Sequence, residues 1–482
     1  MRDVGRNAVL GSVTTAGGSL IGFLVRFAMS AVLARHIAPE QFGVYAQASV
    51  YAAVIGLLAG FSFPQALLQL PEMPGINATV NRLTALSGLV MVVVALVLWP
   101  LLAHVRGDAV AECFVGLVVG QAIAAYGGTY EGELLRHHQW HAAAALRLGA
   151  TFTTVALVVP LGLVAPGPFV LVLRDGLTPL LLIAAMAYVR WRKGFAASTY
   201  HRETAKAVWS LGKALFWNRG LEVILFKVDS ALVGEFLGQR ALGFYDQARY
   251  LAGLPAALVA PISNLVGLRL IASLRDDPTR RARAFALLQW GVARVVFVFT
   301  LGSVLAPELA VRVLFGPAWS ESAPILEMLA IWCLIVPVSS THVMLLTATQ
   351  SWQPIRFGFV TAIVVLVLGL LAFIPLWGGV GAALASTLAV LAELFVRARA
   401  TAAHLDLQPR DHARVALPLI AAFIVGSTIG YLTTQLVEST WGGQALVLIA
   451  GLAAAFMTLV LIEGRHARSE LTYLRNLIRR RS

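Results

Sequence analysis

Long apolar runs separated by short polar segments make up most of the chain. Each run holds about 20 residues, which at the 1.5 Å rise of an α-helix matches the ~30 Å hydrocarbon core of a bilayer. The pattern therefore predicts about fourteen membrane-spanning helices. Their predicted positions are 9–34, 42–70, 82–104, 109–134, 142–164, 168–190, 208–236, 240–268, 285–306, 323–348, 356–376, 378–400, 413–435 and 442–462. The pair that spans 356–400 has the shortest connection. Glycines four residues apart, such as Gly426 and Gly430, predict seams where these helices pack closely.

The composition points to the same class of protein. Hydrophobic residues make up 59% of the chain and charged residues 13%, and the mean hydropathy is +0.79. One soluble core could not bury so many apolar side chains, so we predict an all-α integral membrane protein. Residues 1–7 lead into a full-length span without a cleavage pattern, so we expect the first helix to be retained. Cys113 and Cys333 have no third partner, and we predict no disulfide framework, no metal and no cofactor.

The basic residues orient the predicted helices. With the N-terminus inside, 27 of the 37 Lys and Arg fall in cytoplasmic segments, four fall in opposite segments and six fall within spans. Because basic residues accumulate on the cytoplasmic side, both termini are predicted to be cytoplasmic. The net charge of +13 is spread over loops, which suits anionic membrane lipids as partners and argues against nucleic acid. Residues 465–482 predict a basic amphipathic helix on the inner leaflet.

The chain also repeats itself with an offset of 200 residues. The polar and small residues that match are Gly43 with Gly243, Tyr45 with Tyr245, Gln47 with Gln247 and Ala48 with Ala248. Chance similarity between Leu- and Ala-rich helices is the alternative, but polar matches are harder to obtain by composition. We predict two six-helix lobes in parallel orientation, an N-terminal lobe over 1–200 and a C-terminal lobe over 201–402. Two further helices over 403–464 and the tail complete the chain.

Six cations lie inside the apolar runs, where a charge costs about 2.5–3.5 kcal/mol on insertion scales. They are Arg26, Arg174, Arg219, Lys227, Arg249 and Arg294. Such residues face a polar interior, pair with one another or follow a substrate path. The spacing of three residues allows Arg219 to pair with Glu222, and Asp246 to pair with Arg249. Arg174 lies near the end of its span and is predicted to reach the surface by extending its side chain.

Two segments carry a resemblance to a known family. The related patterns at 40–45 and 240–245 combine a charged residue, a glycine and aromatic residues, and Asp229 stands in the run KVDSALVGEFLG. Together with their flanks, 33–69 and 226–266, they resemble bacterial polysaccharide and O-antigen flippases. These are Wzx-type transporters of the multidrug/oligosaccharidyl-lipid/polysaccharide superfamily. The resemblance implies two six-helix lobes around a central cavity that opens alternately to each side of the bacterial inner membrane.

The resemblance also implies a substrate, a polyprenyl-diphosphate-linked oligosaccharide. Guanidinium groups suit such an anion because they pair bidentately with phosphate. The residues predicted to bind it as cavity cations are Arg26, Arg219, Lys227, Arg249 and Arg294. Buried carboxylates could take up a coupling proton or cation, and the candidates are Asp229, then Glu222 and Asp246. The alternative is that these charges only pair with each other.

Two other classes of protein compete with this interpretation. A cation-coupled drug exporter of the same superfamily would favour an acidic interior, whereas the buried charges here lean positive. A membrane enzyme such as a polysaccharide polymerase needs catalytic residues, and the longest outer loop, 306–324, offers no acid/base constellation. We therefore predict a transporter and not an enzyme. A polysaccharide polymerase and glycosyltransferases are its expected protein partners.

Overall fold

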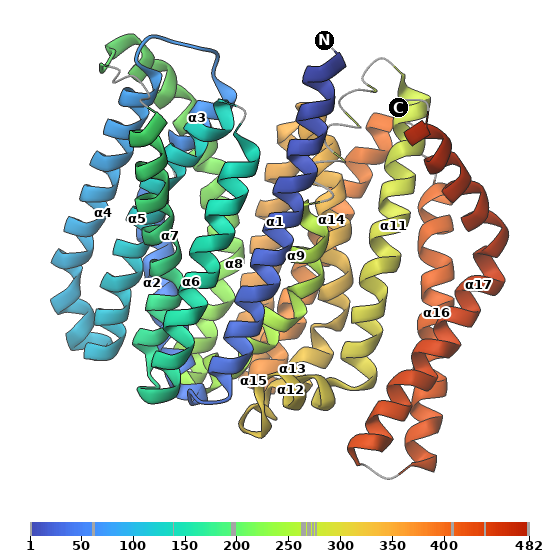
Figure 1. Ribbon diagram of the computed structural model, residues 1–482. Coiled ribbons are helices and arrows are strands. Elements are labelled where there is room, and N and C mark those ends of the chain that lie inside the picture. Colours follow the sequence, from blue (N-terminus) through green and yellow to red (C-terminus); the bar gives the residue numbers. More distant parts are fainter. Residues whose placement is uncertain are drawn as a thin grey trace. The chain divides into compact units, whose positions relative to one another are not determined.

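The computed structural model describes residues 2–59, 63–137, 139–193, 199–261, 267, 271, 274, 277–405, 409–437 and 440–479. All regular secondary structure in these residues is helical (Figure 1). Ten helices in these ranges are long and apolar enough to cross a membrane. The prediction of an all-α, multi-pass membrane protein is confirmed.

The helices follow one another with short connections. Their bounds are α1 Arg2–Ala34, α2 Pro39–Ala59, α3 Phe63–Gln69, α4 Ile76–Arg106, α5 Asp108–Arg136, α6 Trp140–Val164, α7 Pro168–Lys193, α8 Arg202–Ala252, α9 Leu254–Pro261, α11 Pro278–Leu305, α12 Pro307–Phe315, α13 Ser322–Met328, α14 Ala330–Ala348, α15 Trp352–Leu405, α16 Pro409–Leu436 and α17 Trp441–Arg479, with a short 3₁₀ turn, η2, at Pro317–Trp319.

Two helices are too long to cross a bilayer once. The 51 residues of α8 and the 54 residues of α15 would each extend about 75–80 Å if unbroken, more than twice the hydrocarbon thickness. Each is interrupted by a glycine, Gly238 at φ 82° and Gly378 at φ 56°. Glycine has no Cβ and adopts positive φ readily, so it is the residue that permits such breaks. The α15 helix therefore contains both predicted spans of 356–400, whereas α8 contains the predicted span 208–236 and only the first part of 240–268. The number of fourteen spans stays a prediction.

Several predicted spans are divided further. The segment 42–70 contains α2 and α3, and the segment 323–348 contains α13 and α14. The predicted outer loop 306–324 carries α12 and η2. Proline explains most of these differences, because it is tolerated in the first turn of a helix and so begins one, as Pro307 does for α12. Likewise Pro255 stands in the first turn of α9, and the break that precedes it is at Gly253.

The chain forms two compact units. The first contains Met1–Asp246 and Leu370–Ala382, and the second contains Gln247–Gly369 and Ala383–Ser482. The lobe boundaries predicted at residues 200 and 402 stay predictions.

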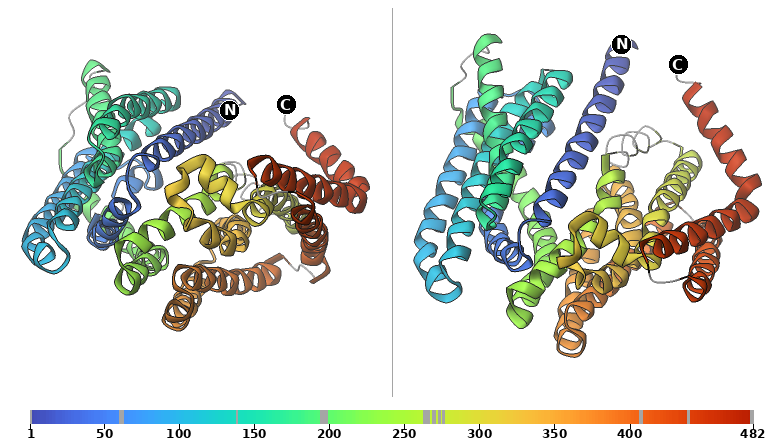
Figure 2. Two further views of the ribbon diagram at one scale, coloured as in Figure 1. Left: turned by 90° about the horizontal axis from the view of Figure 1, so that it is seen from below. Right: turned by 60° about the horizontal axis from the view of Figure 1, so that its bottom comes forward.

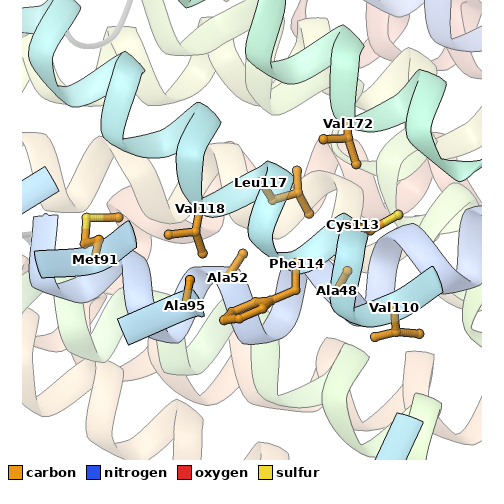
Figure 3. Packing of buried hydrophobic residues seen from close by; sticks show 10 residues of the cluster. All are labelled: Ala48, Ala52, Met91, Ala95, Val110, Cys113, Phe114, Leu117, Val118 and Val172. Carbon is orange, nitrogen blue, oxygen red and sulfur yellow. The ribbon is translucent and has the colours of Figure 1, made fainter. Parts of the chain in front are cut away.

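In the first unit, α5 packs against α2, α4 and α7. The core of this packing is shown in Figure 3 and consists of Ala48, Ala52, Met91, Ala95, Val110, Cys113, Phe114, Leu117, Val118 and Val172. Alanines on α2 and α4 bring the helix axes close to α5, where Phe114 fills the space between them. Such small residues are the usual means of close helix association in a membrane, where water does not drive the contact.

In the second unit, α11 packs against α14, α16 and α17. The α16 and α17 helices lie side by side in Figures 1 and 2 and meet through two glycines. A Cβ on Gly426 would lie 2.9 Å from the carbonyl oxygen of Gly451, and a Cβ on Gly451 would lie 2.9 Å from that of Gly426. The prediction that Gly426 belongs to a packing seam is confirmed.

A reciprocal contact joins the repeated segments within the first unit. Gly43 of α2 lies so close to the carbonyl oxygen of Gln239 that a Cβ would overlap it, and Gly243 of α8 lies in the same way against that of Pro39. Positions 39 and 43 correspond to 239 and 243 under the 200-residue offset. The equivalent positions 40 and 240 also pair, with 3.3 Å between Glu40 Oε1 and Arg240 Nη1. Such reciprocity is what a two-fold relation between two copies produces.

The close contact between α2 and α8 at Gly43 predicts a stability difference between two glycine substitutions. Gly43→Ala would force a methyl group into the Gln239 carbonyl, and we expect a loss of about 1–3 kcal/mol, as for other overpacked sites. Gly149→Ala on α6 is the control, because nothing lies within 4 Å of the place that its new methyl group would occupy, and the change should stay within about 0.5 kcal/mol. Unfolding of the purified protein in detergent measures both. Equal stability of the two variants would contradict the close crossing.

Candidate functional site

A group of polar side chains surrounds Arg174 inside the first unit. Its Nη1 donates to Ser30 Oγ of α1 at 3.2 Å, and its Nη2 donates to the Tyr45 hydroxyl of α2 at 3.1 Å. Its Nε donates to Oδ1 of the adjacent Asp175 at 2.9 Å. The Tyr45 hydroxyl in turn donates to Asp175 Oδ2, and the Arg174 guanidinium lies 5.2 Å from the centre of the Tyr45 ring. Three helices are thus joined through one guanidinium.

A second cation lies beside this group. Lys227 of α8 donates from Nζ to Ser49 Oγ of α2 at 3.1 Å. Asp246 of α8 lies within electrostatic range of Lys227, Arg174 and Asp175. We call the whole set the first-unit polar cluster. It consists of Ser30, Tyr45, Ser49, Arg174, Asp175, Lys227 and Asp246.

Local sequence explains how these helices present the cluster. Tyr45 and Ser49 are four residues apart on α2, so both side chains lie on one face. Lys227 and Asp246 stand on opposite sides of the break at Gly238, which allows both parts of α8 to contribute. The members lie about 4 to 11 residues from the nearest helix end or break, that is, roughly 6–17 Å along the helix. They are therefore deeper than a charge that merely extends to the surface.

This arrangement corrects the prediction for Arg174. Its place near the end of a predicted span suggested that the side chain reaches the surface, whereas only 14% of that side chain is exposed and it bonds to two other helices, α1 and α2. The signal in the sequence was the charged pair Arg174-Asp175 within an apolar run. The partners Ser30 and Tyr45 lie more than a hundred residues away, so local spacing could not identify them.

Asp229, the first candidate for ion coupling, occupies a different environment in the first unit. It is fully buried, its Oδ2 accepts the Tyr245 hydroxyl at 2.8 Å, and its Oδ1 accepts the Ser230 backbone N–H at 2.8 Å. Tyr45 and Tyr245 correspond in the repeat, and each donates to an aspartate. Tyr45 reaches another helix to find Asp175, whereas Tyr245 finds Asp229 on its own helix. The two copies have therefore diverged at the same position.

Two more of the predicted residues of the first unit form the pair that their spacing predicted. Arg219 Nη1 lies 2.8 Å from Glu222 Oε2, and both side chains are about half exposed. The predicted ion pair is confirmed, and neither residue is among the contacts of the first-unit polar cluster. Arg26 is half-buried on α1, where its Nη1 lies 3.7 Å from the position that a Cβ on Gly22 would occupy.

The remaining predicted cations belong to the second unit. The Arg249 guanidinium lies over the ring of Trp332, 5.8 Å from its centre. Arg294 of α11 forms a two-point ion pair with Glu463 of α17, in which Nε donates to Oε2 at 3.1 Å and Nη2 donates to Oε1. Trp290 joins this pair by donating from Nε1 to Glu463 Oε2 at 3.3 Å. These contacts fasten α17 to α11.

A further buried ion pair lies at Arg397, which the sequence pattern assigned to a cytoplasmic segment. Arg397 is 3% exposed and pairs with Glu393 one turn earlier on α15. Its Nη1 also donates to Ser339 Oγ of α14 at 3.1 Å, and its guanidinium lies 4.6 Å from the centre of the Phe359 ring. Glu393, spaced four residues from Arg397, was the available signal.

Comparison with known proteins finds similarity to proteins named for polysaccharide, amylovoran and teichuronic acid biosynthesis. The family described as polysaccharide biosynthesis protein matches residues 32–324. The amylovoran biosynthesis protein AmsL of Erwinia amylovora is 23% identical over 267 residues, which cover 53% of this chain and 66% of AmsL. The teichuronic acid biosynthesis protein TuaB of Bacillus subtilis (strain 168) is 26% identical over 140 residues, 29% of each chain. Both matches cover less than two thirds of the relative.

Solved structures identify the fold. A lipid II flippase, MurJ, in an inward closed conformation superposes with a TM-score of 0.71 at 12% identity, over 95% of this chain and all of that one. An inward-facing MATE family multidrug transporter of the MOP superfamily gives a TM-score of 0.57 at 12% identity, over 82% of this chain and 99% of that one. At such low identity these matches show the fold alone, and they confirm the fold that the resemblance implied.

The pair between Arg294 and Glu463 predicts strong energetic coupling. Each single change, Arg294→Gln or Glu463→Gln, leaves a charge in a buried site and should cost about 3–5 kcal/mol of stability. The double variant removes both charges and should cost less than the sum of the two single changes. The matched control is the exposed pair of Lys206 and Glu203, whose coupling should stay below about 1 kcal/mol. Thermal unfolding of the six variants measures both cycles, and additive losses at Arg294 and Glu463 would contradict the buried pair.

Proposed function

The chain belongs to the polysaccharide biosynthesis protein family, and we propose from this that it is a flippase for a lipid-linked oligosaccharide. Its substrate would be a polyprenyl-diphosphate-linked sugar chain used to build an exopolysaccharide, a capsule or a lipopolysaccharide. The fold shared with MurJ, a lipid II flippase, supports this class of cargo. We place the protein in the bacterial inner membrane with both termini in the cytoplasm.

The first-unit polar cluster is the observation that carries this proposal. Arg174 and Lys227 supply two cations among hydroxyl groups, within helices that are otherwise apolar. A diphosphate needs charge-assisted donors, and a guanidinium supplies them bidentately. The hydroxyl groups of Tyr45, Ser30 and Ser49 both donate and accept, as the hydroxyl-rich sugars require.

The remaining predicted cations have different parts in the proposal. Arg26, Arg219 and Arg249 are proposed to line the path of the anionic headgroup. For Arg294 the two-point pair with Glu463 favours a role in holding α17. These assignments are tested one residue at a time, since a substrate contact and a packing contact respond differently to loss of charge.

We infer that the carboxylates in the cluster couple substrate binding to an ion. When a diphosphate takes the donors of Arg174, Asp175 loses its cationic partner and keeps the Tyr45 hydroxyl, and Asp246 would likewise lose the nearby positive charge of Lys227. A carboxylate without a counter-charge is costly within a membrane, so uptake of a proton or a cation would compensate. Asp246 is then the foremost coupling residue. Asp229 follows it, because substrate need not remove the Tyr245 hydroxyl that it accepts, and Glu222 would lose its counter-charge only where the headgroup takes Arg219.

A cation-coupled multidrug exporter is the second candidate, because MATE family transporters share the fold. Such a protein removes cationic compounds and would use acids as its binding groups. The cluster instead contains two cations, Arg174 and Lys227, which a diphosphate needs and a cationic drug does not. A polysaccharide polymerase and glycosyltransferases are the proposed functional partners, since they make and consume lipid-linked sugars.

The proposal is tested by complementation. Wild type, Arg174→Gln and Lys227→Gln are expressed in cells that lack an exopolysaccharide flippase, together with Arg192→Gln, an exposed arginine outside the cluster, as the control. Surface polymer, membrane abundance of the protein and inner-leaflet lipid-linked precursor are measured. Loss of a charge-assisted contact of about 1.5–3 kcal/mol should lower transport roughly 10- to 100-fold in the cluster variants.

The outcomes separate the candidates. Polymer restored by wild type and Arg192→Gln, with precursor accumulating in well-expressed cluster variants, would support the flippase. Wild type that restores no polymer but expels toxic cations would favour the drug exporter. Full transport by both cluster variants would limit Arg174 and Lys227 to helix packing.

A further inference from the structure

An open groove runs along one side of α15 in the second unit. Its volume is ≈890 Å³. It is lined by residues from both parts of the helix, namely Gln353, Pro354, Arg356, Phe357, Val360, Phe395, Val396, Arg399, Ala400 and Ala403. We call it the α15 groove. It is separate from the first-unit polar cluster and from every residue proposed above to contact substrate.

Two arginines on different faces of α15 have opposite surroundings, one buried and one exposed. Arg397 points inward, where it is 3% exposed and pairs with Glu393. The inner face is tight, because a Cβ on Gly358 would lie 3.1 Å from Arg397 Nε. Arg399 is two residues further and thus about 200° around the helix, and it is exposed in the groove. Burial and pairing therefore explain Arg397 and leave Arg399 to be explained.

Arg356 and Arg399 share this exposed groove. Within the described residues neither has a hydrogen bond or an ion pair. Counted along the chain, they stand about 21–22 residues before and after the break at Gly378, which is roughly 32 Å of helix on each side. That length equals the hydrocarbon thickness, so both guanidinium groups come to one membrane boundary. The distribution of basic residues predicts that this boundary is the cytoplasmic one.

Apart from Gln353, the rest of the groove is apolar, and its larger side chains are exposed. The exposed fractions are 64% for Phe357, 68% for Phe395 and 45% for Val360. Val360 and Phe395 stand closer to Gly378 in the chain than Arg399 does, so they lie toward the hydrocarbon, and Phe357 lies level with the two arginines. The groove therefore has a cationic end at the headgroup level and an apolar stretch at the depth of acyl chains.

We propose that the α15 groove is a binding site for an anionic phospholipid of the cytoplasmic leaflet. Arg356 and Arg399 hold the phosphodiester, because guanidinium groups donate to phosphate oxygens in pairs. Phe357, Val360 and Phe395 contact one acyl chain. Charge complementarity selects this occupant: a neutral helix or a zwitterionic lipid would leave two cations without a full counter-charge at the edge of the hydrocarbon.

Lipid binding to the purified full-length protein tests the site. Native mass spectrometry in detergent is used to titrate wild type with phosphatidylglycerol, cardiolipin and phosphatidylethanolamine, and inorganic phosphate is added separately. The test variant is Arg356→Gln with Arg399→Gln. The matched control is Arg192→Gln with Lys213→Gln, which removes the same charge from two exposed positions of the first unit predicted to face the same side.

Anionic lipid should bind the test variant about 30-fold more weakly than wild type, the loss expected for two basic residues at an anionic surface. The control should change by less than about threefold, and phosphatidylethanolamine should not distinguish the proteins. Unchanged binding of anionic lipid by the test variant would overturn the proposal. So would an equal loss in both double variants, which would reveal a general charge effect, or competition by millimolar inorganic phosphate, which would reveal a site for a free anion. Unfolding temperature without lipid identifies a misfolded variant, and Phe395→Ala then tests the same site through its apolar end.

Discussion

An ionised side chain inside the hydrocarbon needs a partner, and this requirement organises both units of the protein. Water cannot satisfy the charge there, so another helix must do so. In the first unit Arg174 joins α1, α2 and α7, and in the second unit Arg294 joins α11 to Glu463 of α17. Each polar contact fixes the rotation of the helices that make it. Apolar packing alone would define those rotations less sharply, since lipid tails and leucine side chains offer similar surroundings.

The repeat shows how one scaffold can carry different chemistry in its two copies. The reciprocal approach of Gly43 and Gly243 keeps the backbones of α2 and α8 in matching positions. The tyrosines two residues later nonetheless use different acceptors, Asp175 on α7 and Asp229 on α8 itself. The two copies therefore keep the same backbone contact at the glycines and differ in the side-chain hydrogen bonds of the tyrosines. A transporter that must bind an asymmetric cargo benefits from such divergence.

The sequence was sufficient for features that depend on local periodicity. Apolar length predicted the helices, the 200-residue offset predicted the matched glycines, and a spacing of three predicted the contact of Arg219 with Glu222. Contacts between distant helices could not be predicted from the sequence, because they depend on how each helix is rotated about its axis. Glu463 lies 169 residues from Arg294, and no pattern in either segment predicts their contact. The burial of Arg397 could not be predicted either, because it depends on close packing at Gly358, 39 residues earlier in the chain.

The continuity of α17 has a mechanical consequence. This helix continues without interruption from its apolar part to Arg479, and the contact with Arg294 holds it at Glu463. The remaining 16 residues continue the helix for about 24 Å beyond that contact. A small tilt of the membrane part about Glu463 therefore becomes a larger sweep at the far end.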